Sequence, residues 1–424
     1  MPHSHRLAFA VLVLVVVAGG GHHAAGMARL PTTGAPVLAS SAARHSGQEH
    51  ADHAPAPKAL VSQLQTLLSH QATLAMRLTR ATLTDDPGFV DAAGNALVRN
   101  VDDLEAALTR AVGADAAQRL SSQWERQTQS LFQYATGVRD DDVDARRLAT
   151  RQIDGVVEDQ ATLLARLGDG RVDRAAVADA LRSYFDHQIR QVQRFGAGDH
   201  GRAYELQRLA FAATFPLART TAQAAVRVPD PSPTDELRTA LSMLLGEHVE
   251  LAIDTMRAGA TGAEDFEAAA AALDANTRDV TEAMDALFGA KQAQAFNEVW
   301  ADHIDLFVDY TVAVVEGDAA ARDAVREKFD RVMRRFGTTL QRTTGGLVDA
   351  DVVTEEMGAH EQHLIDQIEQ YADDDYRAAH QVSYAAYQHI RHVARVLAAP
   401  FAKAVAEDIP RGGSQTGGGG MARR

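Results

Sequence analysis

The chain has 424 residues, enough for two domains that each bury a core, and its hydrophobic fraction of 46% is ordinary for a globular protein. A formal charge of −15 at pH 7 argues against nucleic acid or an anionic membrane as the main partner, because both would repel the chain. Cysteine is absent, which excludes disulfides, thioether-linked haem and thiolate metal ligands.

The N-terminus has the pattern of an export signal. Polar and basic residues precede an apolar run at residues 7–18, and small residues follow it. The run is too short for a membrane span, which needs roughly 20 apolar residues. We therefore predict a cleaved signal peptide over residues 1–26, an exported protein of the extracellular space or the cell envelope, and no stable membrane insertion of the mature chain.

The rest of the chain divides by composition. Residues 27–58 are rich in Ala, Pro, Ser, Gly and His without periodicity, which is typical of a flexible tether. Apolar residues then recur at helical spacing over 59–228 and again over 234–406. Between the two units stands Pro-Asp-Pro-Ser-Pro at residues 229–233, which cannot continue a helix. The glycine-rich residues 407–424 are predicted to be a disordered tail.

The two units are copies of one another. Trp124 and Tyr134 of the first unit match Trp300 and Tyr310 of the second, both displaced by 176 positions (300 − 124 and 310 − 134). Glycine and aspartate breaks divide the second unit into about six helices, and the first divides similarly. The predicted fold class is all-α, with two tandem, internally duplicated antiparallel helical bundles.

Four predicted helices of the second unit each carry one histidine on their apolar face, where a helix core would ordinarily be hydrophobic. Imidazole suits copper and zinc, and several imidazoles on converging helices form a metal site. Two further histidines lie one turn away and are alternative ligands. The inward residues are His248, His303, His360 and His389, and the alternatives are His363 and His392.

The first unit lacks all four inward histidines. Joint loss of the set favours a shared site over four independent core residues. However, three of the four replacements are polar, so a buried layer of hydrogen-bonding side chains explains the pattern nearly as well. The replacements, in the order given above, are Gln71, Gln127, Tyr184 and Ala213.

Other chemistries have less support. No paired Glu-x-x-His motif of a di-iron bundle, no nucleophile elbow and no phosphate-binding loop occurs in the second unit, which favours a non-catalytic protein. A haem held by His248 with His303 or His389 stays open. The acids beside the inward positions either orient an imidazole or are solvated, and we favour solvation; they are Glu247, Asp302 and Asp305.

The segments LLGEHVEL (residues 244–251) and WADHIDLFVDYT (residues 300–311) resemble a family of exported all-helical proteins from Gram-positive bacteria that carry a recurring histidine per helix. The resemblance covers mainly the second unit. It implies export and a helical repeat, and it supplies no catalytic residue.

Two hypotheses follow from the sequence. In the first, the chain is an exported, non-catalytic helical protein that binds copper or zinc through the inward histidines of the second bundle. In the second, it is a structural or protein-interaction module of the cell envelope, with an unknown envelope protein as its partner, a buried histidine layer and no metal. Converging imidazole nitrogens would favour the first hypothesis, and imidazoles that each have their own partner would favour the second.

Overall fold

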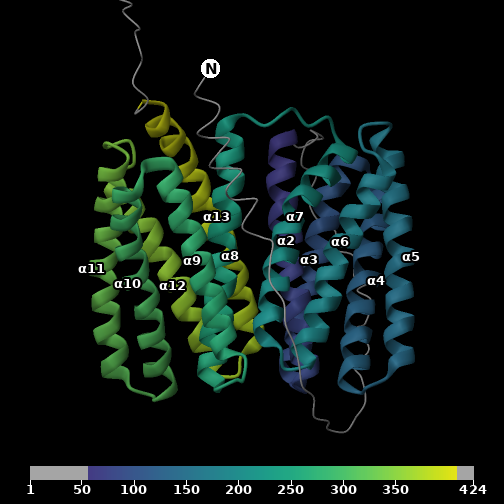
Figure 1. Cartoon of the computed structure of the whole chain (residues 1–424), viewed down its shortest axis with the longest axis horizontal. Helices are drawn as coiled ribbons and strands as arrows, with labels where there is room; N and C mark the ends of the chain where they lie inside the picture. The colour runs from purple at the N-terminus through teal and green to yellow at the C-terminus, as the bar shows by residue number, and fades with distance from the viewer. Residues whose placement is uncertain (1–55, 408–424) are drawn as a thin grey trace, which may run out of the picture.

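A computed structural model of the protein describes residues 56–407, so the predicted signal peptide, nearly all of the tether and the tail after Glu407 lie outside the described residues. Residues 56–407 form twelve helices and no strand, which confirms the all-α prediction. Two antiparallel bundles stand side by side (Figure 1). Within this part of the chain, no helix has both the length and the apolar composition of a membrane span.

The first bundle consists of six helices, in agreement with the number predicted for each unit. They are α2 (Pro57–Leu83), α3 (Pro87–Val112), α4 (Ala114–Arg139), α5 (Val143–Gly168), α6 (Arg174–Gly196) and α7 (His200–Ala225).

The second bundle also has six helices, and its breaks fall where the sequence predicted them. They are α8 (Pro233–Thr261), α9 (Phe266–Phe288), α10 (Ala290–Val315), α11 (Ala319–Thr343), α12 (Ala350–Ala372) and α13 (Tyr376–Glu407).

The helix ends follow from local sequence. Pro233, the last proline of the link, occupies the first turn of α8, where its missing N–H costs no helical hydrogen bond. Ser232 and Asp235 close that end with reciprocal capping hydrogen bonds. Gly113 and Gly289, which an offset of 176 relates, have φ of +81° and +87° and each directly joins two helices. The left-handed conformation favours glycine at both turns. The duplication itself stays a prediction from the sequence.

The bundles meet along four central helices, α2 and α7 of the first and α8 and α13 of the second (Figure 1). In addition, α3 packs against α13 as α9 packs against α7, so the two sides of the contact are built alike. One cluster of buried apolar side chains extends through both bundles. The bundles therefore share a continuous core, whereas the sequence analysis expected each to bury its own.

Candidate functional site

Three of the predicted inward histidines meet in the core of the second bundle. His248 on α8, His303 on α10 and His360 on α12 have exposed fractions of 0%, 0% and 1%. Nε2 of His248 lies 3.4 Å from Nε2 of His303. The ring centroid of His248 is 5.3 Å from that of His303 and 6.1 Å from that of His360. We call these three residues the histidine trio.

Aromatic rings surround the trio. The Trp300 ring lies 4.5 Å from the His248 ring and 4.8 Å from the His303 ring, centroid to centroid. Phe336 on α11 presents its edge to His303 at 5.6 Å, and Phe307 lies 6.4 Å from His360. The surroundings are therefore apolar, and they disfavour any net charge on the imidazoles.

Burial determines the protonation state of the trio. It lowers the pKa of His303 to about 4. Burial and the neighbouring imidazoles hold the pKa values of His248 and His360 well below the ordinary value. All three side chains are therefore neutral at pH 7, which leaves each with one ring nitrogen able to act as a donor to a metal.

The trio is poorly satisfied by protein hydrogen bonds. No atom of residues 56–407 pairs with Nδ1 of His248 or with either ring nitrogen of His360. An unpaired buried polar group costs about 1–3 kcal/mol, so buried polar side chains normally have partners. The trio is therefore not a layer in which each histidine has its own hydrogen-bond partner.

His389 is close enough to lower the pKa of His360, but its own contacts lie outside the trio, so the prediction of one site with four histidines stays a prediction. Its side chain is 18% exposed, and its Nε2–H donates to the carbonyl oxygen of Glu356 on α12 over 2.8 Å. The buried face of α13 at this level includes Ala386, Ile390 and Val393, exposed by at most 3%. His389 lies at the border of that face, because the helix packs with a slightly different rotation from the one the spacing predicted.

The alternative ligands gather around His389 instead of around the trio. The His363 ring lies 5.3 Å from the His389 ring. The Glu356 carboxylate lies 3.4 Å from Nε2 of His389 and 3.3 Å from Nε2 of His392, whose side chain is 46% exposed. The six predicted ligands thus form two groups: a buried trio and a partly exposed group between α12 and α13.

Neither group is a preformed metal site. Within residues 56–407, no three His, Asp or Glu side chains surround a common point as metal ligands would. A haem between His248 and His303 does not fit this structure, because the cavity beside Trp300 and Phe336 has a volume of only about 40 Å³, far less than a macrocycle occupies.

The neighbouring acids do not orient the imidazoles. Asp302 forms an ion pair with Arg335 at the surface, and Asp305 is exposed, as we expected for solvated acids. For Glu247 that expectation was wrong: its side chain is buried and accepts two hydrogen bonds from Arg208 on α7 over 3.1 and 2.9 Å. Glu247 therefore contributes to the contact between the bundles.

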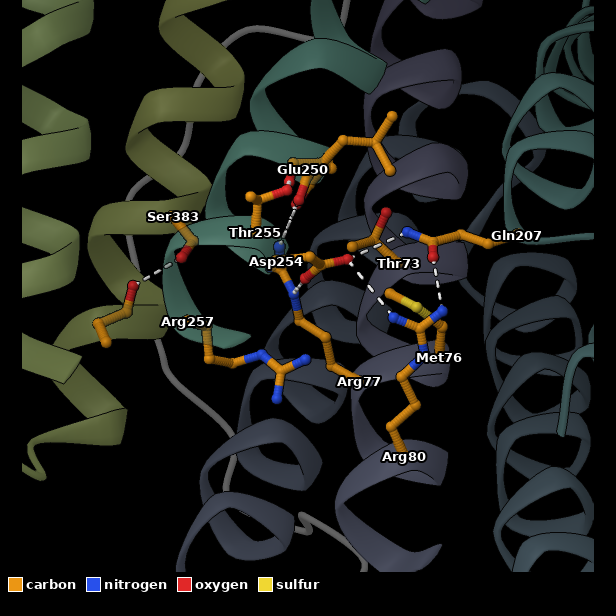
Figure 2. A network of polar contacts seen from close by, with 12 residues as sticks. Thr73, Met76, Arg77, Arg80, Gln207, Glu250, Asp254, Thr255, Arg257 and Ser383 are labelled. Carbon is orange, nitrogen blue, oxygen red and sulfur yellow. Dashed lines mark hydrogen bonds and ion pairs between the residues drawn. The ribbon is translucent and has the colours of Figure 1, made fainter. Parts of the chain in front are cut away.

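A buried ion-pair network, which the sequence analysis missed, joins α2 to α8. Arg77 donates from Nε to Asp254 over 2.9 Å, and its Nη2 lies 2.9 Å from the Glu250 carboxylate (Figure 2). Glu250 also lies 3.1 Å from Nδ1 of His70. Each of these four side chains is at most 3% exposed, so the network is shielded from water.

The network continues toward α7. Gln207 accepts from Arg80 over 2.8 Å and donates to Asp254 over 3.1 Å (Figure 2). The Arg80 guanidinium also stacks on the Tyr204 ring, 3.9 Å from its centroid, and the Tyr204 hydroxyl donates to Asp265. Burial alone would raise the pKa of Asp254, but three arginines lower it and keep the carboxylate ionised. The arginines are Arg77, Arg80 and Arg257.

One signal in the sequence could have revealed this network. An offset of 177 relates Arg77 to Asp254 and Lys58 to Asp235, and both pairs form ion pairs, at 2.9 and 2.5 Å. When two copies pack with their equivalent helices facing each other, equivalent positions meet, so opposite charges there indicate the contact.

No protein family model, curated protein or solved structure matches the chain. The resemblance to exported histidine-bearing helical proteins accordingly stays a prediction, and the function has to be argued from the site itself.

Proposed function

We propose that the protein is a non-catalytic, metal-binding helical protein that holds a copper or zinc ion at the histidine trio. The separation of 3.4 Å between Nε2 of His248 and Nε2 of His303 supports this proposal best. With metal-to-nitrogen bonds of about 2.0–2.1 Å, two ligands of a tetrahedral ion lie about 3.3–3.4 Å apart. This pair thus has the spacing of two ligands on one ion.

His360 is the third ligand in this proposal. Its two ring nitrogens have no partner in the described part of the chain, and its low pKa leaves the imidazole neutral. Because three ligands do not surround a common point in the structure as it stands, binding requires a side-chain rotation of His360. The apolar surroundings strengthen a metal-to-nitrogen bond by excluding competing water.

The second candidate function is a protein-interaction or structural module of the cell envelope without a metal. It is favoured by the lack of three converging ligands among residues 56–407. It is also favoured by the first bundle, where the equivalent positions carry buried Gln71 and Gln127. Export from the cell belongs to both candidates and rests on the apolar run at residues 7–18.

Elemental analysis of the untagged protein, after incubation with zinc or copper and removal of loosely bound ions, distinguishes the two candidates. We expect one tightly bound ion per wild-type chain. His303→Gln, which introduces the residue found at the equivalent position of the first bundle, should abolish it. His392→Gln removes a histidine of the partly exposed group and should retain the ion.

Circular dichroism of each variant checks that the helices are intact. A folded wild-type chain that retains no zinc or copper refutes the metal proposal and leaves the interaction module. Equal loss of the ion in His392→Gln would move the site to the partly exposed group.

A further inference from the structure

A cavity of about 480 Å³ lies where the two bundles and the segment between α7 and α8 meet. Its walls come from the first turns of α2, the second half of α7, the segment between α7 and α8 (residues 226–232) and the start of α8. The volume falls within the range of small-molecule sites, roughly 300–1,000 Å³. Pro216, Pro229 and Pro231 in its wall are exposed, so the cavity reaches the surface.

Most of the wall is apolar. The wall residues of α7 that precede Arg219 are uncharged. The wall residues of α8 that follow Arg238 are uncharged as well. A hydrocarbon chain would therefore find apolar contacts along most of the cavity. The apolar residues of the wall include Val61, Ala212, Phe215, Pro216, Ala240 and Met243.

The charged residues of the wall include one cation without a carboxylate partner. Lys58 and Arg238 both pair with Asp235, over 2.5 and 3.0 Å. Arg219 donates from Nη2 to the carbonyl oxygen of Pro229 over 3.1 Å, and no carboxylate of the described residues forms an ion pair with it. Its remaining N–H groups are a suitable bidentate donor for an anionic group.

The wall carries three cations, Lys58, Arg219 and Arg238, and two acids, Asp235 and Glu236, which leaves a net charge of +1 (3 − 2). Two further features add to its attraction for an anion. The guanidinium of Arg391, 2% exposed and without a carboxylate partner among the described residues, lies 5.4 Å from the centroid of the Phe215 ring in the cavity wall. The N-termini of α2 and α8 both lie at the cavity, and α2 has no side-chain cap. Helix N-termini carry partial positive charge that favours anions.

We propose that this cavity binds an amphipathic monoanion, with the hydrocarbon chain between α7 and α8 and the carboxylate at Arg219. The ligand class is that of long-chain carboxylic acids. The proposal is independent of metal binding, because none of the wall residues belongs to the histidine trio or to the group around His389.

Isothermal titration of the full chain with three probes below their micelle concentrations tests the proposal: dodecanoate, dodecanol and dodecylammonium. We expect dodecanoate to bind with one site per chain and more tightly than the other two. Arg219→Gln should weaken dodecanoate about tenfold, as expected for the loss of a charge-assisted hydrogen bond, and leave dodecanol unchanged. Ala212→Trp should fill the cavity and abolish binding of both.

Arg227→Gln is the matched control, because Arg227 is an exposed arginine of the segment between α7 and α8 and does not line the cavity. It should bind dodecanoate like the wild type. Equal binding of all three probes would refute the anion preference, and unchanged binding by a folded Ala212→Trp variant would refute the site itself. A weakening in Arg227→Gln equal to that in Arg219→Gln would show general charge attraction and overturn the assignment to Arg219.

Discussion

Polar side chains are buried at corresponding positions of the two bundles, but their hydrogen bonding differs. In the first bundle, Gln127 donates to Gln160 over 2.8 Å and Gln188 donates to the Tyr184 hydroxyl over 3.2 Å. In the second bundle, the trio has one side-chain hydrogen-bond contact among the described residues, between His248 and His303. Amides and phenols bond to each other across helices, because amides carry both donors and acceptors at the end of a flexible side chain.

The difference can be traced to one facing pair. An offset of 176 relates Gln127 to His303 and Gln160 to Phe336. Where the first bundle places an amide opposite Gln127, the second places the edge of a phenyl ring 5.6 Å from His303. Two bundles of six helices can therefore hold hydrogen-bonded amides in one and buried imidazole nitrogens without protein hydrogen-bond partners in the other.

The largest predicted effect concerns the buried ion-pair network between α2 and α8, which joins the two bundles. Asp254→Ala removes one of the two carboxylates that lie 2.9 Å from the buried guanidinium of Arg77, and Arg80 loses the same partner, so we expect a loss of about 3–5 kcal/mol in the free energy of unfolding. Urea denaturation measures it. The double variant Arg77→Met with Asp254→Leu removes this charge pair but leaves the buried Glu250 carboxylate without its arginine, so it should recover only part of the loss. A cost below about 1 kcal/mol for Asp254→Ala would show that the network does not stabilise the contact.

Acid should distinguish the two layers. The pKa of His303 is about 4 in the folded protein against about 6.5 when unfolded, so the unfolded chain binds the proton more readily below pH 6.5. Stability is therefore unaffected above pH 6.5 and decreases as the pH falls from about 6.5 to about 4. For His303 the loss amounts to about 3 kcal/mol.

Urea denaturation of the metal-free protein at pH 7 and pH 4 measures this loss. His303→Gln should remove the part of this stability loss that His303 causes, because glutamine does not titrate. His392→Gln at the surface should leave the stability loss unchanged. An unchanged pH dependence in His303→Gln would contradict the assignment of the acid sensitivity to the trio.

The smallest predicted effect tests the hydrogen bond between Gln127 and Gln160 in the first bundle. Gln127→Leu strands the buried amide of Gln160, so we expect a loss of about 1–3 kcal/mol. Replacing both glutamines by leucine removes both polar groups and should be nearly neutral. Thermal unfolding of the single and double variants measures the difference. If the two variants were equally unstable, the hydrogen bond would not account for the role of Gln127.

At most positions of the second bundle, helical spacing was sufficient to predict which residues are buried. Trp300, Tyr310 and three of the four histidines lie inward, exposed by at most 2%, because an inward position on an amphipathic helix is a local property of period 3.6. Proline and glycine likewise predicted the helix ends, since their backbone preferences act within one or two residues.

The sequence by itself therefore determined an all-α chain, the places where its helices end and the inward face of each helix. Only the tertiary structure decided that His389 makes its own contacts outside the trio, that Arg77 meets Asp254 and that a cavity remains beside Arg219. A small rotation of a helix moves a residue at the border of its buried face, and contacts between residues 177 positions apart depend on how whole bundles pack. Neither quantity is contained in the local spacing of the residues.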